Sequence, residues 1–481
     1  MALKHFRGIL FALLAAAVPI IAHADAAGDE ARRQASMERS RESAAAIDRR
    51  NSDQAFQAGL HRASSTGIAP GSSSGGSTSS SSAPNAGFSG GGGASSGPQS
   101  VVSTRIVRVW VGETVAQSAE RLKSEAAAGN PQSQYLLGRM YYAGFGVATN
   151  LTEARRLFVA AADQGHVEGA AYAGQYLVYG RGGSVDMARG LAFLRTAAQA
   201  GNTDAKSVLG IRIMVKAVET GNNADMPEAV RYLEQAAEAG NAVAQAALGT
   251  TLYYYGVGGI VADGVKAVKY LRMGAAQGHP MSMYHLGNLM VNGDEWTGEN
   301  QTEGWALINR AAQAGDGRAL WRLAAASYAG SSSQPKDLPE AVRLMRLSAE
   351  AGDRNGQHGW GQMLYFGAGV AENKPEGLRY TRMAADAFYP DAQYDMALSY
   401  YFGDVGMQKD LVEAARWARL SAENGLPRAE LLFSKLLWAG EGVAQDRVAA
   451  VRWMKKAADH GDETATNDLK DPEVAAILRT L

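Results

Sequence analysis

A tandem repeat occupies most of this chain and restricts it to one kind of fold. Nine successive units of 36 to 39 residues run from Asn130 to Gly461, each starting directly after the last residue of the one before. This period is typical of stacked helix pairs, in which each unit buries its apolar face only against its neighbours. The sequence therefore predicts an all-α solenoid of nine repeats over residues 130–461, without naming a ligand.

The second half of each unit carries the signals of a helix. Fifteen positions before its last residue, every unit has a side chain suited to an N-cap, and in six units a glutamate follows three residues later. We expect these residues to cap the helix and the glutamates to complete capping boxes. The N-cap column is Asn150, Asp186, Asp225, Asp263, Asn300, Asp337, Asn373, Asp410 and Asp446.

Three further columns predict how the helices pack. A bulky residue stands eight positions before the end of each unit, and an alanine stands three positions before the end. We expect the bulky side chain to fill the space between helices and the alanine to let their backbones approach closely. Eight units end in glycine, which permits the left-handed conformation that ends a helix, so the seventh unit, ending in Phe388, should end differently. Small residues recur in the first half of each unit, which predicts close helix contact there. They are Gly138, Gly174, Gly210, Gly249, Gly287, Ala324, Gly361, Ala397 and Ser434.

These columns together resemble a known repeat. The pattern A-x-x-x-L-G-x-x-Y-x-x-G-x-G-V, followed by D/N-x-x-E-A-x-x-W/Y and A-A-x-x-G, is similar to the Sel1-like repeat, a relative of the tetratricopeptide repeat. The resemblance extends over roughly Glu113–Gly461, and the third unit departs from it most. It implies a right-handed α/α superhelical solenoid with capping helices, and a protein-interaction role in which partners bind the concave face lined by the first helices. The tetratricopeptide repeat itself, with a 34-residue period, fits less well.

Residues 1–24 have the features of a secretory signal peptide. Lys4 and Arg7 precede an apolar run, and Ala22-His23-Ala24 forms a cleavage site before Asp25. The alternative is an uncleaved anchor, but the run is shorter than the ~20 residues that span a bilayer. We therefore expect cleavage after Ala24, no membrane span in the mature chain, and a periplasmic or secreted protein.

The segments that flank the repeats are predicted from composition. Residues 25–62 are polar and mixed in charge, as in a disordered arm, and residues 63–100 form a Ser/Gly-rich linker. Residues 101–129 should contain one strand, Val101–Val111, and an N-terminal cap helix; the strand should pack on the first helices or pair with another chain. Residues 462–481 should hold a C-terminal cap helix that starts at Pro472.

Catalytic and cofactor motifs are missing from the sequence. The chain has no cysteine, and its 47 basic and 48 acidic residues balance, so no nucleic-acid partner is indicated. No H-E-x-x-H, Walker or G-x-S-x-G motif occurs in a suitable context, and the histidines are scattered. We predict neither an enzyme nor a bound cofactor or metal.

A stripe on the first helices is the predicted binding surface. Numbered from the small-residue column, positions −3, +1 and +4 share one helix face, which combines aromatic and polar side chains. The predicted partner-binding residues are Tyr135, Arg139, Gln175, Tyr284, Asn288, Trp321, His358, Gln362 and Tyr394. We expect position −3 to be more exposed than position +4, which lies nearer the buried small residues. The alternative is that the aromatic residues only pack between repeats.

Two functions fit this surface. The first is a non-enzymatic scaffold or adaptor of the bacterial envelope that holds a protein or peptide. The second is an envelope polysaccharide or cell-wall binder, whose aromatic residues at Tyr284, Trp321 and Tyr394 would stack on sugar rings.

Overall fold

The computed structural model describes residues 100–103, 108–110, 114–220, 222–254, 263–293, 296–298, 300–330, 335–404 and 406–481. This part of the chain forms 21 helices and one pair of short strands. The predicted signal peptide and polar arm, and all of the predicted linker except Ser100, lie outside the described residues. None of the described helices has the length and apolar character needed to cross a membrane.

Each repeat contains a first and a second helix. The first helices are α4 (Pro131–Ala143), α6 (Val167–Val178), α8 (Thr203–Thr220), α10 (Ala242–Tyr254), α12 (Pro280–Asn292), α14 (Gly317–Ala329), α16 (Arg354–Phe366), α18 (Pro390–Phe402) and α20 (Pro427–Ala439). The second helices are α5 (Leu151–Asp163), α7 (Met187–Gln199), α9 (Met226–Glu238), α11 (Gly264–Ala276), α13 (Gln301–Gln313), α15 (Leu338–Glu350), α17 (Lys374–Asp386), α19 (Leu411–Glu423) and α21 (Arg447–Asp459).

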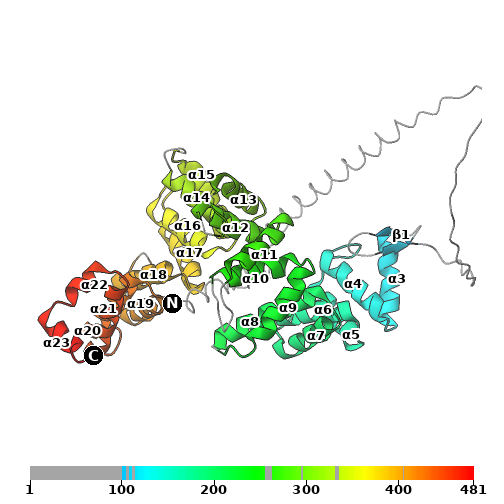
Figure 1. Ribbon diagram of the computed structural model, residues 1–481, viewed down its shortest axis with the longest axis horizontal. Coiled ribbons are helices and arrows are strands. Elements are labelled where there is room, and N and C mark those ends of the chain that lie inside the picture. The colour runs from blue at the N-terminus through cyan, green and yellow to red at the C-terminus, as the bar shows by residue number, and fades with distance from the viewer. Residues whose placement is uncertain are drawn as a thin grey trace, which may run out of the picture. The chain divides into compact units, whose positions relative to one another are not determined.

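The helices stack in chain order, as the solenoid prediction requires. Each repeat helix packs on the one before it and the one after it, and several first helices also contact the first helix of the next repeat (Figure 1). Buried apolar side chains form a series of clusters from α3 (Val115–Ala127) to α23 (Pro472–Leu478), each joining neighbouring helices. The chain is therefore an all-α solenoid whose core extends from repeat to repeat.

The N-cap column behaves as predicted, but the capping boxes do not form. At eight of the nine predicted N-caps the side chain accepts a backbone N–H of the first turn; Asp225 makes no such bond. A capping box also needs the N-cap backbone N–H, and the fold uses that group elsewhere: Asn150 N–H donates to the Tyr141 carbonyl at 2.9 Å. In four units the glutamate instead pairs with an arginine three residues later, as Glu153 does with Arg156. Five of the six predicted boxes were wrong because a contact between the two helices of the repeat takes their donor, and at the sixth the Asp225 side chain forms no capping bond.

The small-residue column lies where the two helices of a repeat cross. A Cβ atom added at Gly287 would come within 2.6 Å of the Gly304 carbonyl oxygen, and one added at Gly304 within 2.7 Å of the Gly287 oxygen. Gly361 and Gly377 face each other in the same way in the seventh repeat. The predicted close contact of helices is confirmed, and its partner is the second helix of the same repeat.

At three places along the array, a buried glutamine joins a first helix to the helix before it. The Nε2 groups of Gln134, Gln245 and Gln393 donate to the carbonyls of Ala126, Ala237 and Ala385 at 2.9–3.2 Å. Each of these alanines stands three positions before the end of its unit. The alanine column therefore supplies a hydrogen-bond acceptor to the following first helix as well as room for it.

The seventh repeat ends like the others, against our prediction. Phe388 has φ 59°, the left-handed conformation that glycine adopts in the other units. Its N–H donates to the Ala385 carbonyl and that of Tyr389 to the Ala384 carbonyl, both at 3.0 Å. The same pair of bonds closes the first repeat at Gly165. These bonds hold a non-glycine residue in a conformation that costs about 1–2 kcal/mol.

The ends of the array also differ from the sequence prediction. Instead of one strand over 101–111, strands β1 (Ser100–Ser103) and β2 (Arg108–Trp110) pair antiparallel with each other, and β2 lies against α3. Pairing satisfies backbone groups that a lone strand leaves open. At the C-terminus a short helix, α22 (Glu463–Asp468), precedes α23.

Removing one working N-cap should cost measurable stability. We expect Asp410→Ala to lower the free energy of unfolding by about 1 kcal/mol, because Asp410 accepts the N–H groups of Val412 and Glu413. Asp225→Ala is the matched control, since its side chain makes no capping bond. Urea unfolding of both variants tests this, and equal losses would show that the cap bond is not the cause.

Candidate functional site

The nine predicted binding residues do not converge on one point. They lie on six first helices, α4, α6, α12, α14, α16 and α18, and are half-buried except Tyr135, which is only 8% exposed. They fall into local groups that lie within or between neighbouring repeats. Each group has its own partners, which decide what it can do.

Tyr135 is part of the core. Its ring stacks on His166 with centroids 5.0 Å apart and meets the edge of Tyr172 at 5.7 Å. The Arg139 guanidinium lies over the same ring, 5.6 Å from its centroid. Burial raises the pKa of the Tyr135 phenol. Tyr135 therefore packs between repeats, as the alternative interpretation of the stripe expected. This corrects the prediction that Tyr135 contacts a partner: its ring instead supports the Arg139 side chain.

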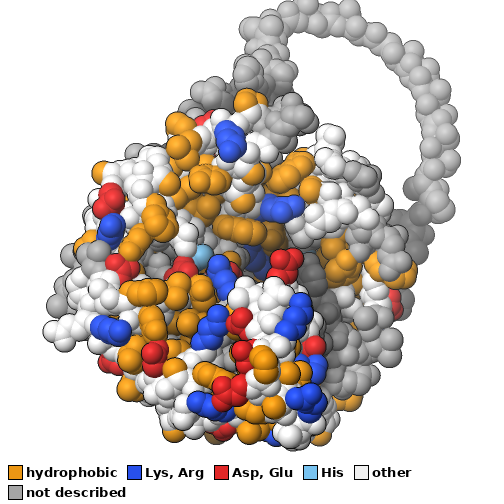
Figure 2. Space-filling model, turned by 90° about the vertical axis from the view of Figure 1, so that its left-hand side faces the viewer, with side chains coloured by type: hydrophobic (Ala, Val, Ile, Leu, Met, Phe, Trp, Pro, Cys, Tyr) orange, Lys and Arg blue, Asp and Glu red, His pale blue; other side chains and the backbone are white. Residues whose placement is uncertain are grey.

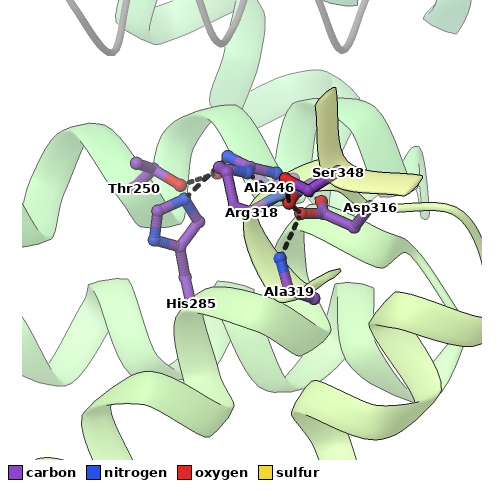
Figure 3. A network of polar contacts seen from close by, with 8 residues as sticks. Ala246, Thr250, His285, Asp316, Arg318, Ala319 and Ser348 are labelled. Atoms are coloured by element: carbon purple, nitrogen blue, oxygen red, sulfur yellow. Dashed lines mark hydrogen bonds and ion pairs between the residues drawn. The ribbon is translucent and has the colours of Figure 1, made fainter. Parts of the chain in front are cut away.

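Tyr284 lies beside a buried polar network of Arg318, Asp316 and His285, which Figure 3 shows. The Arg318 guanidinium lies 5.1 Å from the centroid of the Tyr284 ring and pairs with Asp316 at 2.6 Å. Arg318 Nη1 also donates to Nε2 of His285 at 3.2 Å. Burial alone would raise the pKa of the Asp316 carboxyl, but the Arg318 guanidinium holds it below its usual range. This network ties α12 to the start of α14 and leaves no free charge at Tyr284.

His285 should make the stability of the array depend on pH. Burial, with a smaller effect of Arg318, lowers the pKa of His285 from 6.5 to about 3. Between these values the unfolded chain binds a proton that the folded chain excludes. The contribution of neutral His285 to stability is therefore fully present above about pH 6.5 and is lost as the pH falls, by at most ~1.4 kcal/mol per unit.

This pH dependence can be measured by urea unfolding between pH 7 and pH 4. We expect the free energy of unfolding of His285→Gln to fall less steeply with decreasing pH than that of the unmodified chain. Parallel curves would contradict the assignment to His285.

His358, Gln362 and Tyr394 join neighbouring repeats. A ring nitrogen of His358 and the amide of Gln362 both bond to Oδ2 of Asp395 on α18, at 2.8 and 2.6 Å. The Arg428 guanidinium of α20 lies 4.6 Å from the centroid of the Tyr394 ring. These side chains are half-exposed, so they connect first helices while keeping polar edges at the surface.

The exposure of the stripe differs from the prediction. Its most exposed aromatic residues are Tyr142 and Tyr328, at 47% and 50%, and both occupy position +4. Exposure varies among the residues at position +4, however, because Val178 and Met214 are buried. Position +4 is near the end of most first helices, but α8 continues six residues beyond Met214, so the cover at this position differs from repeat to repeat. Distance from the small-residue column was therefore a poor guide to exposure.

First and second helices carry different kinds of surface. Among the described residues, ion pairs between side chains three or four positions apart in one helix lie on α3 and on second helices. Examples are Glu340–Arg343 and Glu413–Arg416. Such pairs are typical of a solvated face. The first helices carry no such intrahelical pair within the described residues, and their aromatic and neutral polar side chains are interspersed with charged ones whose pairs join different helices, as Asp391–Arg428 does.

A cavity of about 250 Å3 lies on the first-helix side of the N-terminal repeats. Gln175 is the predicted residue that lines it, together with tyrosines of α4 and α6 and residues of α8. The prediction missed Tyr172, Tyr176 and Tyr179, whose spacing of 4 and 3 residues places them on one face of the chain around α6. Following every tyrosine along this helix, rather than three fixed positions, would have found this aromatic face but not the cavity, which is completed by residues of α8.

The visible charge distribution favours neither an anionic nor a cationic ligand. Acidic and basic side chains are intermingled over the face in Figure 2, with hydrophobic side chains between them. Among the described residues, no group of three or more His, Asp or Glu side chains is arranged to hold a metal ion.

Comparison with known proteins follows the same repeat boundaries. The family model described as the Sel1 repeat matches nine times, and the third match, 218–241, is the shortest, in agreement with the departure expected for that unit. The matches cover residues 131–166, 167–202, 218–241, 242–279, 280–316, 317–353, 355–387, 390–426 and 429–462.

Solved structures with similarity to this chain include two bacterial proteins. One is c5321, a protective antigen of uropathogenic Escherichia coli strains with an SLR fold: 25% identity, 76% of each chain covered, TM-score 0.45. The other is a Sel1 repeat protein from Oxalobacter formigenes: 27% identity, 66% of this chain and 89% of the other covered, TM-score 0.41.

Proposed function

Because this chain belongs to the Sel1 repeat family, we propose that it is a non-enzymatic scaffold that holds a protein or peptide partner on the face of its first helices. Sel1 repeat proteins are generally protein-interaction scaffolds and typically not enzymes. The partner's identity does not follow from this membership, so the proposal concerns the kind of ligand and the surface that receives it.

The difference between the two helix layers is the observation that carries the proposal. The second helices bear intrahelical ion pairs, which water solvates well, whereas the first helices expose Tyr142 and Tyr328 beside neutral polar groups such as Gln175 and Asn288. Protein interfaces are enriched in aromatic residues and depleted of charge at their centre. The aromatic side chains of the first-helix face fit this composition, and charged side chains there, such as Asp391 and Arg428, are paired with each other.

The proposed contact residues follow from exposure. We retain the predicted residues whose side chains are partly exposed: Arg139, Gln175, Asn288, Trp321, Gln362, Tyr284, Tyr394 and the polar His358. We add Tyr142 and Tyr328, the most exposed aromatic residues of the stripe. Tyr135 is excluded as a direct contact because its ring is buried.

We place this function in the bacterial periplasm or outside the cell. The support is the N-terminal pattern of Lys4, Arg7, an apolar run and Ala22-His23-Ala24, which is typical of a cleaved signal peptide. Separating the periplasm, the medium and the membranes of producing cells tests the location. A chain that stays in the cytoplasm with residues 1–24 attached would contradict it.

A polysaccharide or cell-wall ligand is the second candidate. The open rings of Tyr142 and Tyr328 could stack on sugar rings as well as on a protein. Binding of the purified full chain to an envelope fraction, measured at high salt with and without prior protease treatment of the fraction, distinguishes the two. Loss of binding after protease treatment is expected for a protein partner, and unchanged binding would favour the glycan.

A further inference from the structure

The cavity in the N-terminal repeats lies between matching faces of α6 and α8. Residues with the same spacing of 4 and 3 positions line it from both helices, which places each set on one helix face. They are Tyr172, Tyr176 and Tyr179 on α6 and its C-cap, and Asp204, Val208 and Ile211 on α8. Its volume of about 250 Å3 is below the ~300–1,000 Å3 that is usual for pockets holding a whole small molecule. The cavity therefore suits a side chain of a larger ligand.

Arg181 places a guanidinium at the end of this cavity where α6 finishes. Its backbone N–H donates to the Tyr176 carbonyl at 2.9 Å, which holds the residue against the last turn of α6. The half-buried guanidinium lies 5.7 Å from the centroid of the Tyr179 ring, and it forms no hydrogen bond or ion pair within the described part of the chain. A cation therefore lines the cavity with an aromatic ring beside it and no acidic partner among these residues.

A second guanidinium adds positive charge near the same ring. Arg212 of α8 also lies 5.7 Å from the Tyr179 centroid, and within the described residues its hydrogen bond goes to the uncharged sulfur of Met187 at 3.5 Å. Burial raises the pKa of the Tyr179 phenol, so the phenol supplies no negative charge at neutral pH. Acidic and basic side chains are intermingled over the face in Figure 2, but this end of the cavity is electropositive.

Asp204, the acidic residue of the lining, acts on another part of the cavity. It is the second residue of α8, and it accepts a hydrogen bond at 2.8 Å from the amide of Asn241, which directly precedes α10. Burial raises the pKa of Tyr172, and Asp204 raises it further. Arg181 instead lowers the pKa of Tyr179, against the larger effect of burial. Seven residues separate the two tyrosines, about 10 Å along a helix, so Asp204 does not neutralise Arg181.

We propose that this cavity receives the carboxylate of a glutamate or aspartate side chain of the bound protein on Arg181, an inference that rests on the proposed function. The pairing is geometrically favourable, because the planar guanidinium donates two parallel N–H bonds to the two oxygens of a carboxylate. The carbon chain of the acidic residue packs against the tyrosine rings. A neutral side chain would leave the guanidinium without a counter-charge, and a basic one would be repelled by it.

The carboxylate belongs to a side chain rather than to the end of the partner's chain. The proposed binding surface continues on both sides of the cavity, with Arg139 on α4 and Asn288 on α12. A partner that covers this surface passes the cavity within its chain, so its terminal carboxylate lies elsewhere.

The first test asks whether Arg181 serves the fold, and it needs no ligand. Arg231→Gln is the matched control for Arg181→Gln: the Arg231 guanidinium lies 5.3 Å from the centroid of Tyr232 and forms no hydrogen bond or ion pair with described residues, but it is on α9, outside the cavity. We expect the two full-chain variants to melt at the same temperature, since each loses one ring contact. A clearly lower melting temperature for Arg181→Gln would show that this side chain stabilises the array and would overturn the proposal.

The second test uses small probes and the full chain. Saturation-transfer NMR would compare N-acetylglutamate methylamide with its glutamine analogue, with N-acetylalanine, which offers a terminal carboxylate, and with glucuronate, an acidic sugar. We expect signal from the glutamate probe, at least about threefold weaker signal from the other three, its loss in Arg181→Gln and its retention in Arg231→Gln. Equal signal from the glutamine probe, no signal, retention in Arg181→Gln, or stronger signal from N-acetylalanine or glucuronate would overturn the proposal.

The outcomes separate this inference from the proposed function. Probe binding is measured without the partner, so its failure removes the carboxylate subsite and leaves the scaffold proposal standing. A failure to find a protein on the first-helix face, with the probes bound as expected, would instead remove the scaffold proposal and leave a cavity that selects carboxylates.

Discussion

Replacing Gly287 with valine is expected to lower the free energy of unfolding by about 3 kcal/mol, the upper part of the range for overpacked cores. A Cβ atom at this position would lie 2.6 Å from the Gly304 carbonyl oxygen and 3.0 Å from Cγ1 of Ile308. The first of these neighbours is backbone, so α12 and α13 would have to move apart. Valine adds two further methyl groups to the same contact.

Asn288→Val is the control for this prediction. Asn288 is the next residue of the same helix and is half-buried, so the variant has a similar helix propensity without the helix–helix clash. Urea unfolding and native-state hydrogen exchange over α12 and α13 would measure both variants, since a repeat array can unfold in parts. Similar small losses in the two variants would contradict a close crossing at Gly287.

The second large effect is expected at Arg318. Arg318→Met should cost about 3–5 kcal/mol, because it leaves the Asp316 carboxylate buried without its cation. The side chains of Arg318 and Asp316 are 16% and 6% exposed, and the guanidinium also bonds to His285 and lies over Tyr284. One substitution therefore disrupts a charge pair, a hydrogen bond and a ring contact.

Arg343→Met separates burial from charge. Arg343 pairs with Glu340 three residues earlier on α15, but its side chain is 59% exposed. Exposed pairs of this kind contribute about 0–1 kcal/mol, so the control should unfold close to the unmodified protein in urea. If Arg318→Met were no more destabilised than Arg343→Met, the network in Figure 3 would not stabilise the array.

The helices were predictable because their signals are local. An N-cap such as Asp410 bonds to backbone groups two and three residues away, and the small-residue column acts within one helix pair. Nine copies of each signal then set the period and the family resemblance. Fold class therefore followed from residue columns alone.

Two predictions about helix ends were wrong because the backbone forms hydrogen bonds that the residue types do not reveal. Asn150 satisfies the N-cap pattern, but its N–H donates to Tyr141 of the preceding helix, so no capping box forms. Phe388 lacks the glycine signal, yet the surrounding bonds impose the same backbone conformation. The first outcome depends on a contact between two helices and the second on backbone bonds to the end of α17, and a single column of residue types contains neither.

The candidate site was predictable only in part for the same reason. The sequence identified the first-helix stripe, but exposure depends on how far each neighbouring helix covers a given turn. Tyr142 is open while Val178, at the same position of the next repeat, is buried. The cavity beside Gln175 depends on α6 and α8 together, so no repeat column marks it.

The most direct test of the scaffold proposal is photo-crosslinking in producing cells. A photoreactive phenylalanine analogue would replace Tyr142 or Tyr328 on the first helices, and Val265 or Val412 on the second helices as controls. The control side chains are both 65% exposed, so they are at least as accessible as the test positions. We expect a discrete protein adduct from the first-helix positions only, identified by mass spectrometry. Adducts of equal yield from both layers, or none from the first helices, would contradict a protein partner on this face.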